Sequence, residues 1–445
     1  MRKLLLSVAI GLLTIGPLMA QNAFEEHFTD ATLRLDYAFV GDASHQAIYL
    51  RKMLNVPVWA GRRNHLSEPL LKGNGQVRVT DPQTGECLYS NSFSSLFQEW
   101  TVIPEAKHTQ KAFESTLQVP FPKHPVNVEV TLTDVHGQVS ARILHPVDPA
   151  DILIRPLASN GLTSVLLSGK PDSRKVIDIV IVSEGYTQAD EAKFFKDSQR
   201  AVDALFSHEP FASNKDKFAV RAVFAPSADS GVSIPRKGEW RSTATSSHFD
   251  TFYTDRYLTT SDVWQIADLI GTVPYEHIIV LANTDKYGGG GIYNSLTIMN
   301  SDHVTFVPVL VHEFGHAFGG LADEYAYASE GSDTMYPAGT EPWEPNITNL
   351  TDFASKWQDM LPEGVPVPTP VDELDKQDVR RIWRTFTPEQ KAQLNLKLGV
   401  YEGAGYEMYG VYRPVQECRM RINECEEFCP VCTRAIIRMI QYYTE

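Results

Sequence analysis

The residues best suited to chemistry in this chain are His312, Glu313 and His316, which form a His-Glu-x-x-His segment. On a helix the two histidines lie four residues apart on one face, so both imidazoles can reach a single zinc ion. The glutamate beside the first histidine can then take a proton from the water that attacks a substrate. The spacing predicts a site for one zinc ion, with His312 and His316 as metal ligands and Glu313 as the general base.

The third metal ligand must come from beyond the helix, where two acidic residues follow the motif. Gly319 and Gly320 end the helix, and glycine adopts positive φ at little cost, so the chain can turn back toward the metal. This turn predicts Asp323 as the third ligand, with Glu324 as its rival. The carboxylate that does not bind the metal is interpreted as a support for the ligands.

Residues 312–325 resemble the signature of the bacterial IgA-type metallopeptidases, peptidase family M64. The similarity extends to residues 410–414, 418–420 and 428–432, and it covers most of the chain after about residue 165. The resemblance implies a zinc endopeptidase domain behind a separate N-terminal β domain. It makes host immunoglobulin and mucosal glycoproteins candidate substrates, but it does not assign either to this chain.

Two methionines are candidates for the methionine turn, the apolar turn that lies beneath the metal in metzincin peptidases. Met335 follows a Ser-Asp-Thr segment, whereas Met420 follows Cys418 and precedes a cysteine-rich, aromatic stretch. By similarity to the adamalysin-like metzincins we favour Met420, as a floor under the ligands rather than a ligand itself.

Four of the five cysteines, Cys418, Cys425, Cys429 and Cys432, lie within fifteen positions. Such a cluster is typical of a structural zinc site in a cytosolic chain, but a secreted chain favours disulfides. The adamalysin analogy implies a bond from Cys418 to Cys432 or Cys429. Cys87 has no evident partner.

The start of the chain indicates export. Residues 1–20 have the form of a secretory signal peptide, with Arg2 and Lys3 before an apolar run and Ala20 at its end. We therefore expect a secreted or periplasmic protein, without a lipid anchor because no cysteine follows the cleavage point. No later stretch predicts a membrane span. The net charge of −15 argues against a nucleic-acid partner.

The predicted fold class is α+β, with an antiparallel β-sandwich in residues 21–160. Its predicted strands show period-two alternation, and its hairpin turns are rich in Asp and Gly. The strands are at 33–40, 76–80, 116–119 and 126–132, and the turns at 81–85 and 134–137. This domain either contacts a glycan or other surface or mainly packs on the catalytic domain.

Residues 165–445 predict a metzincin-like α/β zinc metallopeptidase domain, after a boundary between Pro156 and Pro171. Strands and helices alternate as such a domain requires. The strands are at 176–182, 218–224 and 277–282, with helices at 189–206 and around the His-Glu-x-x-His segment. A glycine-rich loop at 287–291 is expected to lead into an exposed edge strand that holds an extended peptide. The insertion at 327–403 is expected to contain helical stretches at 379–386 and 388–398.

Together these features predict a secreted zinc-dependent endopeptidase that hydrolyses peptide bonds of protein substrates. The alternative is a secreted protein- or glycan-binding factor whose metal site is structural or vestigial. The intact Glu313 favours the enzyme, because a structural site has no use for a base beside its metal.

Overall fold

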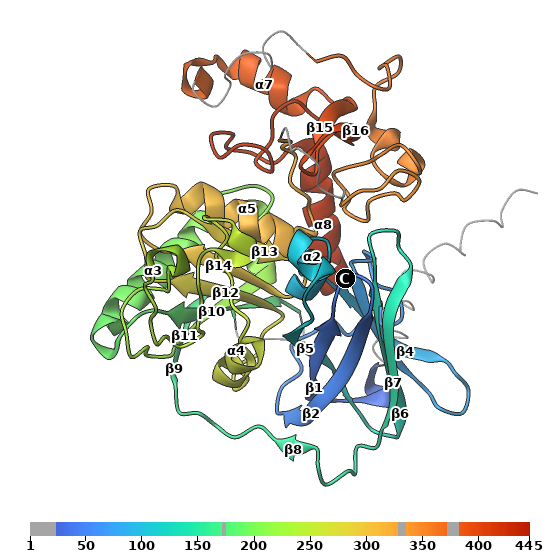
Figure 1. Ribbon diagram of the computed structural model, residues 1–445, viewed down its shortest axis with the longest axis vertical. Helices are drawn as coiled ribbons and strands as arrows, with labels where there is room; N and C mark the ends of the chain where they lie inside the picture. Colours follow the sequence, from blue (N-terminus) through green and yellow to red (C-terminus); the bar gives the residue numbers. More distant parts are fainter. Residues whose placement is uncertain (1–23, 171–174, 328–334, 372–381) are drawn as a thin grey trace, which may run out of the picture.

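The structure is a computed structural model that describes residues 24–170, 175–327, 335–371 and 382–445. The predicted signal peptide lies outside the described residues. Within them, no helix is long and apolar enough to cross a bilayer. Figure 1 shows an N-terminal β region, a mixed α/β region beside it and an outer part that carries α7, β15 and β16.

The N-terminal region consists of two four-stranded sheets whose inner faces contribute to one hydrophobic core. Strand β6 shows why these segments are strands, because its residues alternate between buried and half-buried positions. The first sheet has the order β5 (Lys111–Pro122), β1 (Phe28–Gly41), β2 (Gln46–Val56) and β8 (Arg155–Pro156). The second has the order β4 (Cys87–Phe93), β3 (Gly75–Thr80), β6 (Val126–Thr133) and β7 (Val139–Val147).

The second region is built on a six-stranded sheet with a parallel centre and antiparallel edges. All eight residues of β10 are buried, as expected for a central strand covered on both faces. The strand order is β13 (Gly289–Ile292), β14 (Leu296–Asn300), β12 (His277–Ala282), β10 (Ile177–Glu184), β11 (Phe218–Phe224) and β9 (Thr163–Ser168).

Helices cover both faces of this sheet (Figure 1). One face packs on α3 (Glu191–Leu205), α5 (Phe306–Gly319) and α8 (Pro430–Thr444), and the other packs on α4 (Val263–Ile270). Along the chain β10, α3, β11, α4 and β12 alternate as predicted, and β13 and β14 come before the motif-bearing helix α5.

The outer part comprises α7 (Pro388–Leu396) and the hairpin of β15 (Tyr401–Ala404) and β16 (Glu407–Arg413). Helix α7 matches the stretch predicted at 388–398. The stretch predicted at 379–386 lies partly outside the described residues, and Trp383–Thr385 within it form a short 3-10 helix.

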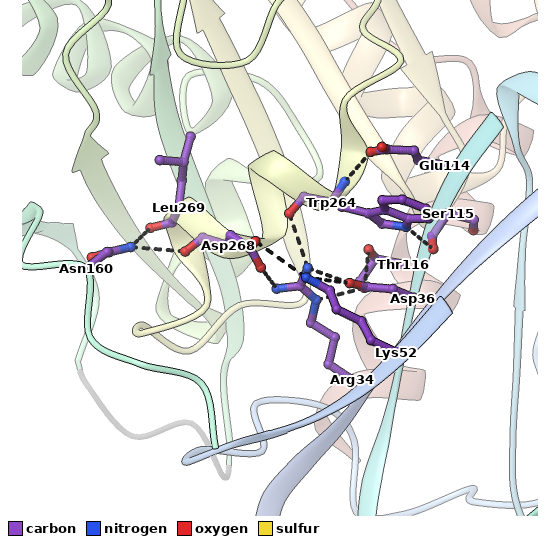
Figure 2. A network of polar contacts seen from close by, with 10 residues as sticks. All are labelled: Arg34, Asp36, Lys52, Glu114, Ser115, Thr116, Asn160, Trp264, Asp268 and Leu269. Carbon is purple, nitrogen blue, oxygen red and sulfur yellow. Dashed lines mark hydrogen bonds and ion pairs between the residues drawn. The ribbon is translucent and has the colours of Figure 1, made fainter. Parts of the chain in front are cut away.

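A polar network centred on the buried Arg34 joins the two regions (Figure 2). Arg34 of β1 is fully buried, pairs with Asp36, and donates to Asp268 of α4 at 2.6 Å and to the Trp264 carbonyl at 3.1 Å. The Trp264 indole returns a hydrogen bond to the Ser115 carbonyl at 3.1 Å. These contacts fix α4 against the N-terminal sheet and hence the position of one region relative to the other.

Candidate active site

Helix α5 carries the His-Glu-x-x-His segment and ends where the paired glycines predicted. Its apolar residues face the sheet, and Gly320 follows the last helical residue in the left-handed conformation, with φ of 61°. A Cβ at Gly320 would also lie 2.5 Å from the Leu71 side chain. The reversal at Gly320 brings the following residues back toward the histidines.

The side chains of His312, His316 and Asp323 converge on one point. The Nε2 atoms of His312 and His316 are 3.1 Å apart. Asp323 Oδ1 lies 3.0 Å from His312 Nε2 and 3.3 Å from His316 Nε2. Two nitrogen ligands about 2.0–2.1 Å from a tetrahedral zinc ion lie roughly 3.3 Å apart. Asp323 Oδ1 is buried, and its polar neighbours are the two imidazole nitrogens. The donor set and its spacing thus fit a divalent metal.

Of the two acidic residues weighed as third ligand, Asp323 is the one directed at the imidazoles. Glu324 points away from them, and its Oε1 lies 3.1 Å from Cys432 Sγ. Adjacent side chains of a non-helical segment can face opposite sides, and these two carboxylates do so.

Hydrogen bonds orient each ligand from behind. His312 Nδ1 lies 3.0 Å from the Arg419 carbonyl and His316 Nδ1 lies 2.5 Å from the Leu321 carbonyl. A carbonyl only accepts, so both Nδ1 atoms carry the proton and both Nε2 lone pairs point to the shared site. The Tyr406 hydroxyl donates to Asp323 Oδ2.

The pKa shifts of His316 and Asp323 follow from their close contact. Burial lowers the pKa of His316, but the Asp323 carboxylate outweighs it and raises the pKa to about 9. Burial opposes ionisation of Asp323, yet the imidazoles hold its pKa well below the ordinary value. Without a metal the cluster therefore binds a proton, which a metal ion must displace.

Glu313 lies beside this cluster and against the edge strand β13. A Cβ on Gly289 would be 3.3 Å from Glu313 Oε1, and a Cβ on Gly291 would be 2.2 Å from the Glu313 carbonyl oxygen. A side chain at position 291 would clash with the helix backbone, whereas one at position 289 would make a tight contact with the Glu313 side chain, because the strand passes directly over the helix. Burial raises the pKa of Glu313, although the two imidazoles oppose that rise.

The glycine-rich segment differs from the expectation of a flexible loop leading into an edge strand. The glycines themselves form edge strand β13, and residues 296–300 form β14, which is fully buried between β13 and β12. Gly289 also accepts a hydrogen bond from Leu258 N–H at 3.4 Å. Part of the edge expected to bind a peptide is thus already paired.

The site opens into a cavity of about 580 Å³. Its floor includes the motif residues, and β13 forms one wall. Aromatic side chains, which could contact a peptide substrate, line the cavity. They include Tyr257, Tyr287, Tyr325, Tyr327, Tyr336 and Tyr406.

The N-terminal region contributes to this cavity through α2 (Leu96–Thr101), which the sequence reasoning missed. Phe97 and Trp100 anchor the helix in the β core, while Glu99 faces the cavity and accepts the Tyr257 hydroxyl at 2.6 Å. Burial raises the pKa of Glu99 to about 7. Six residues are too few for helical periodicity to signal this element.

Met420 lies under the motif helix, as favoured over Met335. Its side chain is fully buried, and its Sδ is 2.9 Å from the point where a Cβ on Gly315 would lie. Met335 instead lines the cavity, and the three residues before it lie outside the described part of the chain.

The disulfide predicted from Cys418 is not formed. Cys418 Sγ and Cys432 Sγ are 3.9 Å apart, and all five cysteines are free thiols. A disulfide requires an S–S distance of about 2.05 Å.

A helix that presents two imidazoles and a glutamate, followed by a returning carboxylate in an open cavity, is typical of metallopeptidases. Comparison with known families agrees with that class. The family described as IgA Peptidase M64 matches residues 165–440, and Peptidase M64 N-terminus matches residues 23–143. The chain belongs to the IgA peptidase M64 family and is a peptidase. A search of curated proteins found no match.

Proposed function

We propose that this protein is a secreted zinc-dependent endopeptidase. The observation that carries the proposal is the convergence of three ligand atoms, 3.0–3.3 Å apart, beside Glu313 at the floor of an open cavity. We further propose that the catalytic domain is metzincin-like and that the two N-terminal sheets form a β-sandwich.

In this proposal His312, His316 and Asp323 hold the zinc ion. Zinc would polarise the scissile carbonyl and lower the pKa of a water molecule to about 7. Glu313 accepts the proton of the attacking water and delivers it to the leaving amine.

Cleavage within a protein chain is supported by the shape and walls of the cavity. A peptide substrate can lie along the unpaired part of β13, and tyrosines can contact its side chains. Glu99 and its neighbours on α2 place the N-terminal region on the rim. We propose that this region acts with the catalytic domain on substrate, and that a glycan attached to the substrate is a further candidate for contact.

The test is Glu313→Ala in the full chain, measured by casein cleavage with and without a chelator. We expect a loss of roughly 100- to 10,000-fold in cleavage, the usual contribution of a general base, with the zinc content unchanged. Glu86→Ala, in the exposed turn after β3, is the matched control and keeps full activity.

Full activity of Glu313→Ala would contradict the role of Glu313. A wild-type protein that binds zinc and protein ligands but cleaves none would favour the alternative of a protein- or glycan-binding factor. Incubation with a mucosal protein extract, with fragments read by mass spectrometry, would distinguish immunoglobulin from mucosal glycoproteins as substrate.

A further inference from the structure

A second cluster of metal-ligating side chains lies behind the candidate active site. It comprises Glu324, Cys418, Cys429 and Cys432, all buried, with one ligand atom from each within 4.8 Å of the others. Cys425 is not among them, although it lies in the same stretch of sequence. No step of the proposed hydrolysis uses this cluster.

The sulfur positions fit a metal better than a disulfide. Sγ of Cys418 and Sγ of Cys432 are 3.9 Å apart. Two thiolates about 2.3 Å from a tetrahedral zinc ion lie roughly 3.8 Å apart. The carboxylate of Glu324 supplies a fourth group, with Oε1 at 3.1 Å from Cys432 Sγ.

Glu324 gives an independent indication of a missing partner. The residue has no exposed surface, and its Oε1 accepts a hydrogen bond from Asn346 Nδ2 at 2.9 Å. Its other oxygen, Oε2, is buried and has no hydrogen-bond partner among the described residues. A buried carboxylate oxygen is costly without a donor or a cation, and a metal ion in the cluster would compensate it.

The backbone around the cysteines supplies the hydrogen bonds that metal thiolates need. The N–H of Cys429 donates to Cys418 Sγ at 3.3 Å, and the N–H of Cys432 donates to Cys429 Sγ at 3.5 Å. Cys429 is also the N-cap of α8, where the helix dipole favours a negative sulfur. A Cys-x-x-Cys pair at a helix start, joined by a third cysteine, is typical of structural zinc sites.

The cluster is connected to the candidate active site through the chain. Glu324 directly follows the proposed ligand Asp323, and its N–H donates to the Met420 carbonyl at 2.8 Å. Cys418 directly precedes Arg419, whose carbonyl accepts the His312 Nδ1 proton. A metal held by the cluster would therefore fix both the segment that carries the third ligand and the segment that orients the first.

We propose that Glu324, Cys418, Cys429 and Cys432 form a second, structural zinc site. The four protein groups enclose the ion, so that it has no open position for a substrate. Binding releases the thiol protons to solvent and changes no oxidation state. The site is separate from the proposed catalytic zinc, and either could exist without the other.

The test uses the full wild-type chain, stripped of metal and titrated with cobalt(II), which reports thiolate ligands by their charge-transfer absorption. We expect two cobalt ions per chain, one of which produces the sulfur band. Cys429→Ser should bind one ion and lose the band. Cys425→Ser, which removes a buried thiol outside the cluster, should keep both.

The two metal sites are distinguished by His316→Ala, which should lose one ion and retain the sulfur band. If Cys429→Ser does not fold, Glu324→Gln serves instead and should bind cobalt at this site more weakly. A wild-type chain without the sulfur band would overturn the proposal. A thiol titration of the denatured wild-type chain in chelator should count all five cysteines of the sequence. A lower count would show a disulfide and would also overturn the proposal.

Discussion

Replacement of Tyr406 by phenylalanine tests whether Asp323 is held in place for a metal ion. The Tyr406 hydroxyl donates to Asp323 Oδ2, while Oδ1 lies beside the two imidazoles. Phenylalanine keeps the ring in its contacts with Tyr325 and Tyr327 and removes only this hydrogen bond. The carboxylate then loses its orientation toward the metal.

The expected magnitude follows from the burial of the two partners. A hydrogen bond to a charged group contributes about 1.5–3 kcal/mol. Asp323 is 5% exposed, but Tyr406 is 37% exposed, so water can partly replace the hydroxyl and the lower end of this range applies. We therefore expect roughly tenfold weaker zinc binding, the lower end of the effect of losing a partner behind a ligand.

The assay is competition for zinc against a chromogenic chelator at fixed pH, with the wild type beside the variant. Tyr409→Phe is the matched control, because Tyr409 is close in sequence and 78% exposed. An unchanged affinity in Tyr406→Phe would refute the reasoning, as would an equal loss in both variants.

Three further results follow from the structure. Zinc affinity should rise by roughly tenfold per pH unit up to the His316 pKa of about 9, because one proton must leave before the metal binds. A zinc affinity that calorimetry finds independent of pH in this range would contradict this. Glu99→Gln should leave the acidic limb of kcat/KM nearly unchanged, because burial raises the pKa of Glu99 to about 7 and the side chain is already neutral on that limb; a shift of about one pH unit or more would contradict this. Arg34→Met should lower the free energy of unfolding by about 3 kcal/mol, because Asp36 loses its main buried partner. Breaking the exposed Arg142–Glu129 pair should lower it by less than about 1 kcal/mol. Equal losses on denaturant titration would contradict a stabilising role for the Arg34 network.

The elements that could be predicted from the sequence are those with strong local signals. The continuous apolar runs of β10, β11 and β12 and the periodicity of α3 gave the alternating order of the catalytic region. The paired glycines gave the end of α5, because positive φ at Gly320 is a local property.

The parts that could not be predicted depend on contacts between distant segments. Tyr406 reaches Asp323 across 83 positions, and Glu99 enters the cavity because the N-terminal region docks against the catalytic region, through contacts such as the Ser94 N–H to the Tyr293 carbonyl and Tyr257 to Glu99. Neither Tyr406 nor Glu99 belongs to a recognisable motif. The sequence also left Asp323 and Glu324 as rivals, since only the folded turn shows which carboxylate faces the histidines and which faces the cysteines.

The central claim is tested most directly by anomalous X-ray scattering from a crystal of the wild-type chain, measured on both sides of the zinc absorption edge. We predict a zinc peak about 2.0–2.2 Å from His312 Nε2, His316 Nε2 and an Asp323 oxygen, with Glu313 unbound and the fourth position open to the cavity. Absence of zinc between these residues, or an ion enclosed there by four protein groups, would contradict the account.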